Sequence, residues 1–175
     1  MEYVTCSAME TRRLGAALAA ALRSGDTVLL EGDLGAGKSE FARGVARGLG
    51  YTCPVPSPTF TILNEYEGGR LKLHHFDFYR LSGPDELYES GLQEFIGAEG
   101  VTLIEWGEVA REALPEDCLK CTLTPLGEEK RRIVLEEQGA FRRLPALSPG
   151  TEEGGVHPME QGPEAGSADR KEDKA

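Results

Sequence analysis

The chain has 175 residues and a formal net charge of -11 at neutral pH. This length suggests one domain that can bury a core without disulfides. The acidic balance argues against a protein that binds nucleic acid by itself, because such proteins usually carry a basic surface. Any nucleic acid is therefore expected to be reached through a partner protein.

An amphipathic helix is predicted first, over about residues 7–23. Ser7 and Glu10 fit a capping box at its start, and Leu14 and Leu18 share its apolar face. Acidic residues upstream and the amphipathic pattern argue against an export signal, and no apolar run is long enough to span a membrane. Reduced cysteines in a chain for which no export signal is predicted favour a cytoplasmic protein.

The next segment, residues 32–39, fits the phosphate-binding P-loop (Walker A) pattern Gly-x-x-x-x-Gly-Lys-Ser. An apolar strand predicted over residues 27–30 leads into it, and a helix ending near Gly50 follows. Lys38 would reach the outer phosphates, and Ser39 would offer its hydroxyl to Mg²⁺. The nucleotide-binding residues predicted here are Asp33, Leu34, Gly35, Ala36, Gly37, Lys38 and Ser39.

Three alternate prolines in residues 53–58 then predict a stiff extended loop. Strands predicted over residues 59–66 and 71–77 form a hairpin around a Gly-Gly turn. Asp77 ends the second strand, where it either holds Mg²⁺ or caps the following turn, and spacing leaves both open. His75 shares its face and is expected to orient a neighbour by hydrogen bonding, whereas Tyr79 is expected to pack.

A short helix is predicted over residues 84–89, and an apolar strand over residues 101–104 follows it. Glu105 ends this strand in the manner of a Walker B segment. It is a candidate to hold the metal shell or to deprotonate the attacking water, and the alternative is an edge-strand glutamate in solvent. Trp106 is either a core residue or part of a partner surface, and the core is expected.

The domain is expected to finish with a helix over residues 108–114 and a hairpin of residues 118–124 and 131–137. Cys118 and Cys121 have the spacing of a zinc or redox pair, but strand alternation would send them to opposite faces, so we expect neither function. Residues 1–144 are thus predicted to form the domain. Residues 145–175, rich in Pro, Gly and acidic groups, are predicted to be a disordered tail.

Four motifs in this order closely resemble those of the TsaE (YjeE) family, the bacterial ATPases of tRNA threonylcarbamoyladenosine biosynthesis. They are residues 32–39, Ser-Pro-Thr-Phe at 57–60, His-Phe-Asp-Phe-Tyr-Arg at 75–80 and Ile-Glu-Trp at 104–106. The resemblance covers roughly residues 3–137. Glu40 departs from it, because a small hydroxyl residue is common at that position.

The resemblance implies an α/β P-loop NTPase-like fold with a mostly parallel central sheet, added antiparallel strands and flanking helices. It implies ATP with Mg²⁺ as cofactors, metal contacts from Ser39, Asp77 and Glu105, and catalytic roles for Lys38 and Glu105. It also suggests Thr59 in a switch-like loop, and a nucleotide contact from each of Thr11 and Arg132. Implied partners are TsaB- and TsaD-type proteins, through which tRNA is reached, with no membrane.

Two other functions remain open from the residues alone. A small-molecule P-loop kinase would use the same loop, although no Arg-rich lid segment is apparent in the sequence. A nucleotide-gated interaction module would bind ATP with negligible hydrolysis. A GTPase is disfavoured, because the sequence lacks the Asn/Thr-Lys-x-Asp segment that reads guanine.

Overall fold

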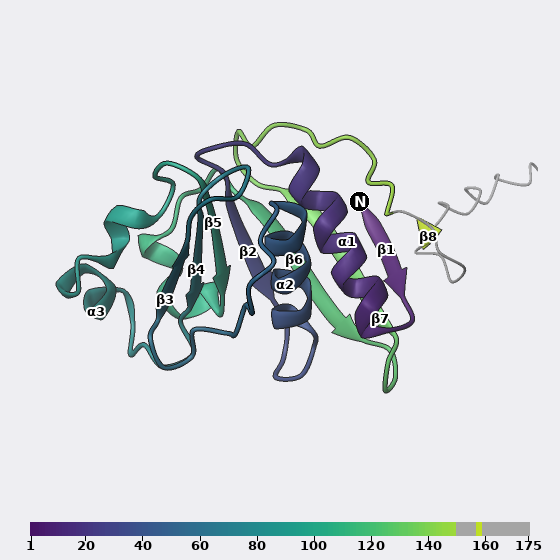
Figure 1. Ribbon diagram of the computed structural model, residues 1–175. Helices are drawn as coiled ribbons and strands as arrows, with labels where there is room; N and C mark the ends of the chain where they lie inside the picture. Colours follow the sequence, from purple (N-terminus) through teal and green to yellow (C-terminus); the bar gives the residue numbers. More distant parts are fainter. Residues whose placement is uncertain (150–156, 159–175) are drawn as a thin grey trace, which may run out of the picture.

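The computed structural model describes residues 1–149 and 157–158 of the chain. One sheet runs through it, with strand order β3-β4-β5-β2-β6-β7-β1-β8 (Figure 1). The strands are β1 (Glu2–Thr5), β2 (Thr27–Glu31), β3 (Leu63–Tyr66), β4 (Leu73–Asp77), β5 (Val101–Glu105), β6 (Leu119–Pro125), β7 (Arg131–Glu137) and β8 (His157–Pro158). The helices are α1 (Ala8–Ala21), α2 (Lys38–Gly48) and α3 (Pro84–Glu89), with 3₁₀ segments η1 (Leu92–Phe95) and η2 (Gly107–Ala113).

The four central strands are parallel, and the outer strands are antiparallel. β4, β5, β2 and β6 pair in parallel, whereas β3 joins β4, and β7 joins β6 and β1, in the antiparallel sense. Both predicted hairpins are present. The predicted fold class, a mostly parallel α/β sheet with added antiparallel strands, is therefore confirmed.

Helices cover both faces of the sheet. Figure 1 shows α1 and α2 side by side over one face, and β2 divides its side chains accordingly: Val28 and Leu30 pack in the core beneath these helices. Leu29 packs on the other face in a second core that includes residues of α3 and η2. Cys118 belongs to the second core and Cys121 to the first, so the expected separation of the two cysteines is confirmed.

Close packing of glycines fixes α1 against α2. A Cβ added at Gly44 of α2 would collide with the backbone oxygen of Arg12, and one at Gly15 of α1 with that of Phe41. Small residues allow two helix backbones to approach in this way. Because α2 begins at the P-loop, this contact brings the start of α1 beside the predicted nucleotide site.

Some elements differ from the sequence prediction. β1 was not predicted, and it adds to the sheet beside β7. β3 starts at Leu63 rather than at residue 59, because the carbonyl of Pro58 accepts from the N–H groups of Thr61 and Ile62 and forms a turn there. The helix predicted at 108–114 is a kinked 3₁₀ segment with non-helical angles at Ala110.

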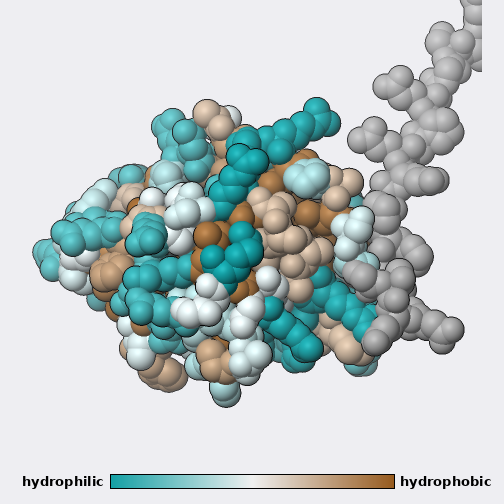
Figure 2. Space-filling model, turned by 45° about the horizontal axis from the view of Figure 1, so that its top comes forward, coloured by the Kyte–Doolittle hydropathy of each residue, from teal (hydrophilic) through white to brown (hydrophobic). Residues whose placement is uncertain are grey.

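The chain packs on the domain as far as Leu147, beyond the predicted domain end at residue 144. Leu147 is buried, and its N–H donates to the hydroxyl of Tyr3 at 3.0 Å. Most of the predicted disordered tail lies outside the described residues. Figure 2 shows hydrophilic residues over much of the face it presents, with apolar residues gathered between them. No helix in the described residues has the length and apolarity needed to cross a membrane.

Candidate functional site

Three parallel strands end together at one edge of the sheet and bring the predicted site residues to one cavity. β2 runs into the P-loop, its neighbour β5 ends at Glu105, and Asp77 at the end of β4 pairs in register with Glu105. The cavity measures about 530 Å³. Its lining consists of residues 34–40, Arg43, Ser57, Thr59, Asp77, Tyr79, Glu105 and Trp106.

The P-loop has the backbone form that phosphate binding needs. Gly35 and Gly37 adopt left-handed angles, with φ of 79° and 104°, and α2 begins directly after them. Gly32 lies so close to β6 that an added Cβ would collide with the carbonyl oxygen of Leu123. The first N–H groups of α2 have no carbonyl partner within the helix, so they and the helix dipole favour an anion at this point.

Lys38 is folded back onto its own loop. Its ammonium group donates to the carbonyl oxygens of Gly32 at 2.5 Å and Asp33 at 3.0 Å. It also lies 4.0 Å from the centre of the Trp106 ring. Burial lowers the pKa of Lys38 below its ordinary value, although nearby carboxylates, Glu105 first among them, oppose the shift. The contacts of this buried ammonium group are with carbonyl oxygens and an aromatic ring. Lys38 is therefore suited to exchange these contacts for contacts with phosphate oxygens.

Glu105 is the centre of a buried hydrogen-bonded group. Its side chain is almost fully buried; Oε1 lies 2.9 Å from Nε2 of His75, and Oε2 accepts from the Ser39 hydroxyl at 3.0 Å. Strand β5 lies inside the sheet, between β4 and β2. The alternative of an edge-strand glutamate in solvent is therefore wrong. The expectation that His75 orients a neighbour is confirmed.

Asp77 caps the turn after β4 and also lines the cavity, so the cap is observed and the Mg²⁺ contact stays a prediction. Its Oδ1 accepts from the backbone N–H of Tyr79 at 2.9 Å, which caps the turn after β4. Its Oδ2 accepts from the hydroxyls of Ser57 and Thr59, each at 2.7 Å, and the side chain lines the cavity. The proline-rich loop thus brings two hydroxyl groups to the same buried carboxylate. The contact between Ser57 and Asp77 was not predicted from the sequence.

Two aromatic residues pack together at the cavity, Tyr79 as expected and Trp106 outside its predicted role. Trp106 is only partly buried, adopts a positive φ of 61° and lines the cavity. It is therefore not the core residue that was expected for a large aromatic side chain. Tyr79 is 53% exposed, and its ring packs at 5.2 Å from that of Trp106. The turn after β5 aims Trp106 across the P-loop, which strand periodicity cannot reveal.

Arg131 lies against the P-loop in place of Arg132. Its Nε donates to the carbonyl oxygen of Ala36 at 3.0 Å. Arg132 instead forms a two-pronged ion pair with Glu2 of β1, at 2.6 and 2.9 Å, and does not line the cavity. The side chains of adjacent strand residues point to opposite faces of the sheet. A prediction that is one residue out therefore names the arginine on the wrong face.

Thr11 is close to the loop without lining the cavity. Its methyl group would lie about 4.0 Å from a Cβ atom added to Gly37, so it is near the loop. Its hydroxyl, however, is hydrogen-bonded to the hydroxyl of Thr5 at 2.9 Å. Asp33 is also absent from the lining and meets the site through its backbone oxygen. The structure therefore unites most of the predicted site residues and leaves Thr11, Asp33 and Arg132 at its margin.

The donor set fits Mg²⁺ held jointly with phosphates. Two buried carboxylates and the Ser39 hydroxyl offer hard oxygen atoms, and their hydrogen bonds come from neutral hydroxyl and N–H groups or a histidine. Among the described residues no group of three or more His, Cys, Asp or Glu forms a metal cage. Mg²⁺ is usually bound in this manner, by one or two carboxylates together with substrate phosphates.

Comparisons with known proteins find relatives along most of the chain. A family model described as "Threonylcarbamoyl adenosine biosynthesis protein TsaE" matches residues 5–133. The tRNA threonylcarbamoyladenosine biosynthesis protein TsaE of Bacillus subtilis is 41% identical over 139 residues, covering 79% of this chain and 87% of that protein. The protein of the same name from Treponema pallidum is 41% identical over 135 residues, covering 77% of this chain and 99% of its own.

A solved structure extends the likeness to the fold. The crystal structure of YdiB from Bacillus subtilis matches with a TM-score of 0.69 and 37% sequence identity, covering 79% of this chain and 86% of that one. The family match spans both the P-loop and the strand that ends at Glu105. The chain therefore belongs to the TsaE family of threonylcarbamoyl adenosine biosynthesis proteins.

Proposed function

We propose that this protein binds ATP with Mg²⁺ and hydrolyses it to ADP and phosphate in the threonylcarbamoylation of the adenosine next to the anticodon of tRNA. TsaB- and TsaD-type proteins are its proposed partners, and the cytoplasm, where tRNA is modified, its proposed location. The observation that carries the ATPase is the position of Glu105. It is a carboxylate with 2% exposure, hydrogen-bonded to Ser39 at the start of the P-loop helix.

Each proposed role follows from what the side chain touches. The loop N–H groups and Lys38 would bind the phosphates, while Ser39, Asp77 and Glu105 would hold Mg²⁺. Bound Mg²⁺ would neutralise charge that develops on the phosphate oxygens. Glu105 would orient a water molecule and accept its proton at a carboxylate oxygen, and His75 would keep the other oxygen in place.

The contacts of the site also support weak activity in the isolated protein. Ser39 is bonded to Glu105, and the hydroxyls of Ser57 and Thr59 are bonded to Asp77. The groups proposed to meet the nucleotide and Mg²⁺ are thus paired with one another. Binding of the nucleotide and Mg²⁺ must replace these contacts within the protein by contacts with the ligands. A partner that stabilises the ligand-bound arrangement would therefore raise the rate of ATP hydrolysis. The net charge of -11 agrees with tRNA being met through such partners.

The test compares ATP hydrolysis by the wild type and Lys38→Ala, each alone and with matched TsaB- and TsaD-type proteins. We expect strong stimulation by the partners in the wild type and a loss of at least about 100-fold in the variant, because the lysine meets the outer phosphates. Undiminished turnover in Lys38→Ala would refute the proposed site. ATP binding without stimulation would instead support the nucleotide-gated interaction module. Consumption of ATP that depends on a small acceptor would support a kinase.

A further inference from the structure

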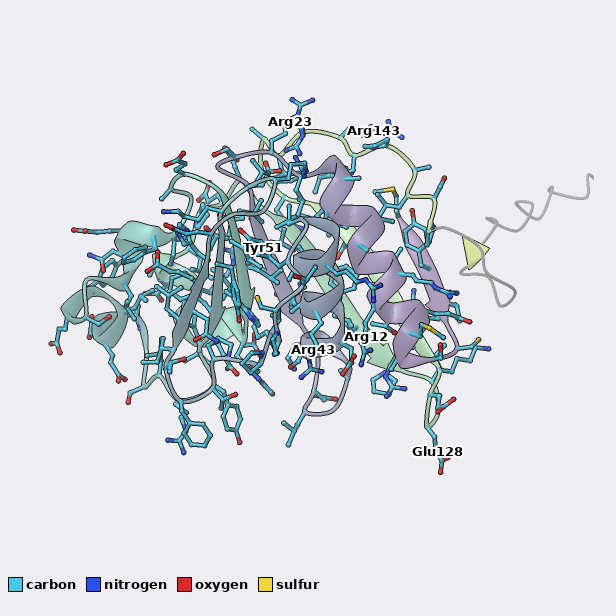
Figure 3. The ribbon with its side chains drawn as sticks, viewed as in Figure 1. Arg12, Arg23, Arg43, Tyr51, Glu128 and Arg143 are labelled. Atoms are coloured by element: carbon cyan, nitrogen blue, oxygen red, sulfur yellow. The ribbon has the colours of Figure 1, made fainter. Side chains whose placement is uncertain are left out.

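A second cavity, larger than the first, lies beside the nucleotide cavity. It measures about 700 Å³ and is lined by Arg12, Arg43, Arg47 and residues 51–56; we refer to it as the arginine groove. Three guanidinium groups and no acidic residue line it, in a chain whose net charge is -11. Figure 3 shows Arg12 and Arg43 near each other, one from α1 and one from α2, whereas Arg23 and Arg143 lie at the opposite end of the molecule.

Glu40 holds part of this positive charge in place. Its carboxylate accepts from Nε of Arg12 and from Nη1 of Arg43, and so ties α1 to α2. Burial raises the pKa of Glu40, but the two arginines outweigh this and lower it overall. Arg47, one helical turn further along α2, is exposed and forms no ion pair with any residue that the structure describes. The groove therefore keeps a net positive charge available to a ligand.

From this charge and lining we infer that the arginine groove binds an acidic segment of a partner protein. Guanidinium groups pair with carboxylates in a planar, two-pronged manner. The lining also includes the apolar residues Pro54, Val55 and Pro56, which suit the side chains of a peptide. This inference rests on the proposed function, since it names the surface on which a partner acts.

RNA fits the arginine groove less well than an acidic peptide does. Single-stranded RNA is usually held by exposed aromatic rings on which bases stack. The only aromatic ring among the described lining residues belongs to Tyr51, which is 8% exposed and donates its hydroxyl to the carbonyl oxygens of Tyr66 and Leu71. The acidic remainder of the protein would also repel a polyanion with a charge at each nucleotide.

The groove is connected to the nucleotide cavity by one residue and one loop. Arg43 lines both cavities, and its Nε donates to the carbonyl oxygen of Val55 at 3.1 Å. Two and four residues after Val55 come Ser57 and Thr59, whose hydroxyls contact Asp77. A segment bound in the groove would press on the outer side of the loop that carries these hydroxyls. Partner binding would thereby alter the contacts of Asp77 and the rate of hydrolysis.

The test uses Arg47→Glu in the full-length chain, with Arg23→Glu as a matched control. Arg23 is also exposed but lies away from the groove, so the two variants carry the same charge change (Figure 3). The affinity for the TsaB- and TsaD-type pair is measured by calorimetry at two salt concentrations, and basal ATP hydrolysis is measured without partners. We expect Arg47→Glu to weaken partner binding about tenfold, with a smaller salt dependence, and to leave basal hydrolysis unchanged.

The controls separate the possible outcomes. Arg23→Glu should bind the pair within about twofold of the wild type, and Arg47→Lys, which keeps the charge but loses the two-pronged geometry, should recover only part of the affinity. Equal affinity of Arg47→Glu and Arg23→Glu for the pair would overturn the inference. So would a loss of affinity for purified tRNA in place of a loss for the proteins. Absence of ATP hydrolysis in the wild type with partners would count against the proposed function, while the affinity comparison would still test the groove.

Discussion

Glu105→Gln separates the charge of the central carboxylate from its packing. In the structure Oε1 lies 2.9 Å from Nε2 of His75, and Oε2 accepts from the Ser39 hydroxyl at 3.0 Å. A glutamine amide fills the same space, and it can accept from one neighbour and donate to the other. The substitution therefore removes the negative charge and the proton acceptor while both buried contacts are kept.

The expected effects on rate and stability differ widely. A positioned general base contributes about 10²–10⁴ to a rate, which corresponds to about 3–5 kcal/mol of the barrier. Changing a charge-assisted hydrogen bond into a neutral one costs the fold about 1 kcal/mol. We therefore expect kcat to fall at least about 100-fold, while the melting temperature changes by no more than about 4 °C.

Turnover is measured with saturating ATP and partners, and nucleotide affinity by fluorescence of Trp106. This is the single tryptophan of the chain, and its ring lies 4.0 Å from the Lys38 ammonium group, so nucleotide binding should change its emission. Glu112→Gln is the control, because Glu112 is an exposed carboxylate that does not line the cavity. If Glu105→Gln binds ATP normally and turns it over within about threefold of the wild type, the carboxylate is neither the proton acceptor nor a necessary part of the metal shell.

Two further predictions concern the packing of α1 on α2. The pKa of Glu40 is lowered in the folded protein, so its ionised carboxylate stabilises the fold at pH values above 4.5, the ordinary pKa. This stabilisation is lost as the pH falls through the lowered pKa. Glu40→Gln should thus be about 0.5–1 kcal/mol less stable at pH 7, since both partner arginines are partly exposed, and urea titrations should converge with wild type in acid. Gly44→Ala places a Cβ on the backbone oxygen of Arg12, so we expect about 2 kcal/mol of destabilisation in urea unfolding despite the better helix propensity of alanine. Wild-type stability in Gly44→Ala would show that the helices separate freely.

Most local elements of this protein were determined by its sequence, although β1 and the kinked 3₁₀ form of η2 were not predicted from it. The P-loop needs left-handed backbone angles at Gly35 and Gly37, which glycine alone adopts readily, so the pattern identifies its own geometry. Apolar runs with short turns specified the central strands and both hairpins, and a carboxylate at the end of two such runs marked Asp77 and Glu105. These features depend on residues near one another in the chain, and for that reason the sequence was sufficient to predict them.

Tertiary structure alone decided which distant residues meet. β5 inserts between β2 and β4, so Glu105 becomes a buried partner of Ser39 rather than an exposed edge residue. The register of β7 with β1 gives Arg132 to Glu2 and leaves Arg131 for the P-loop. A pairing shifted by one residue would exchange these roles with no change in local sequence preference, because side chains alternate between faces of a strand. Such outcomes depend on the packing energy of the whole sheet, which no single segment contains.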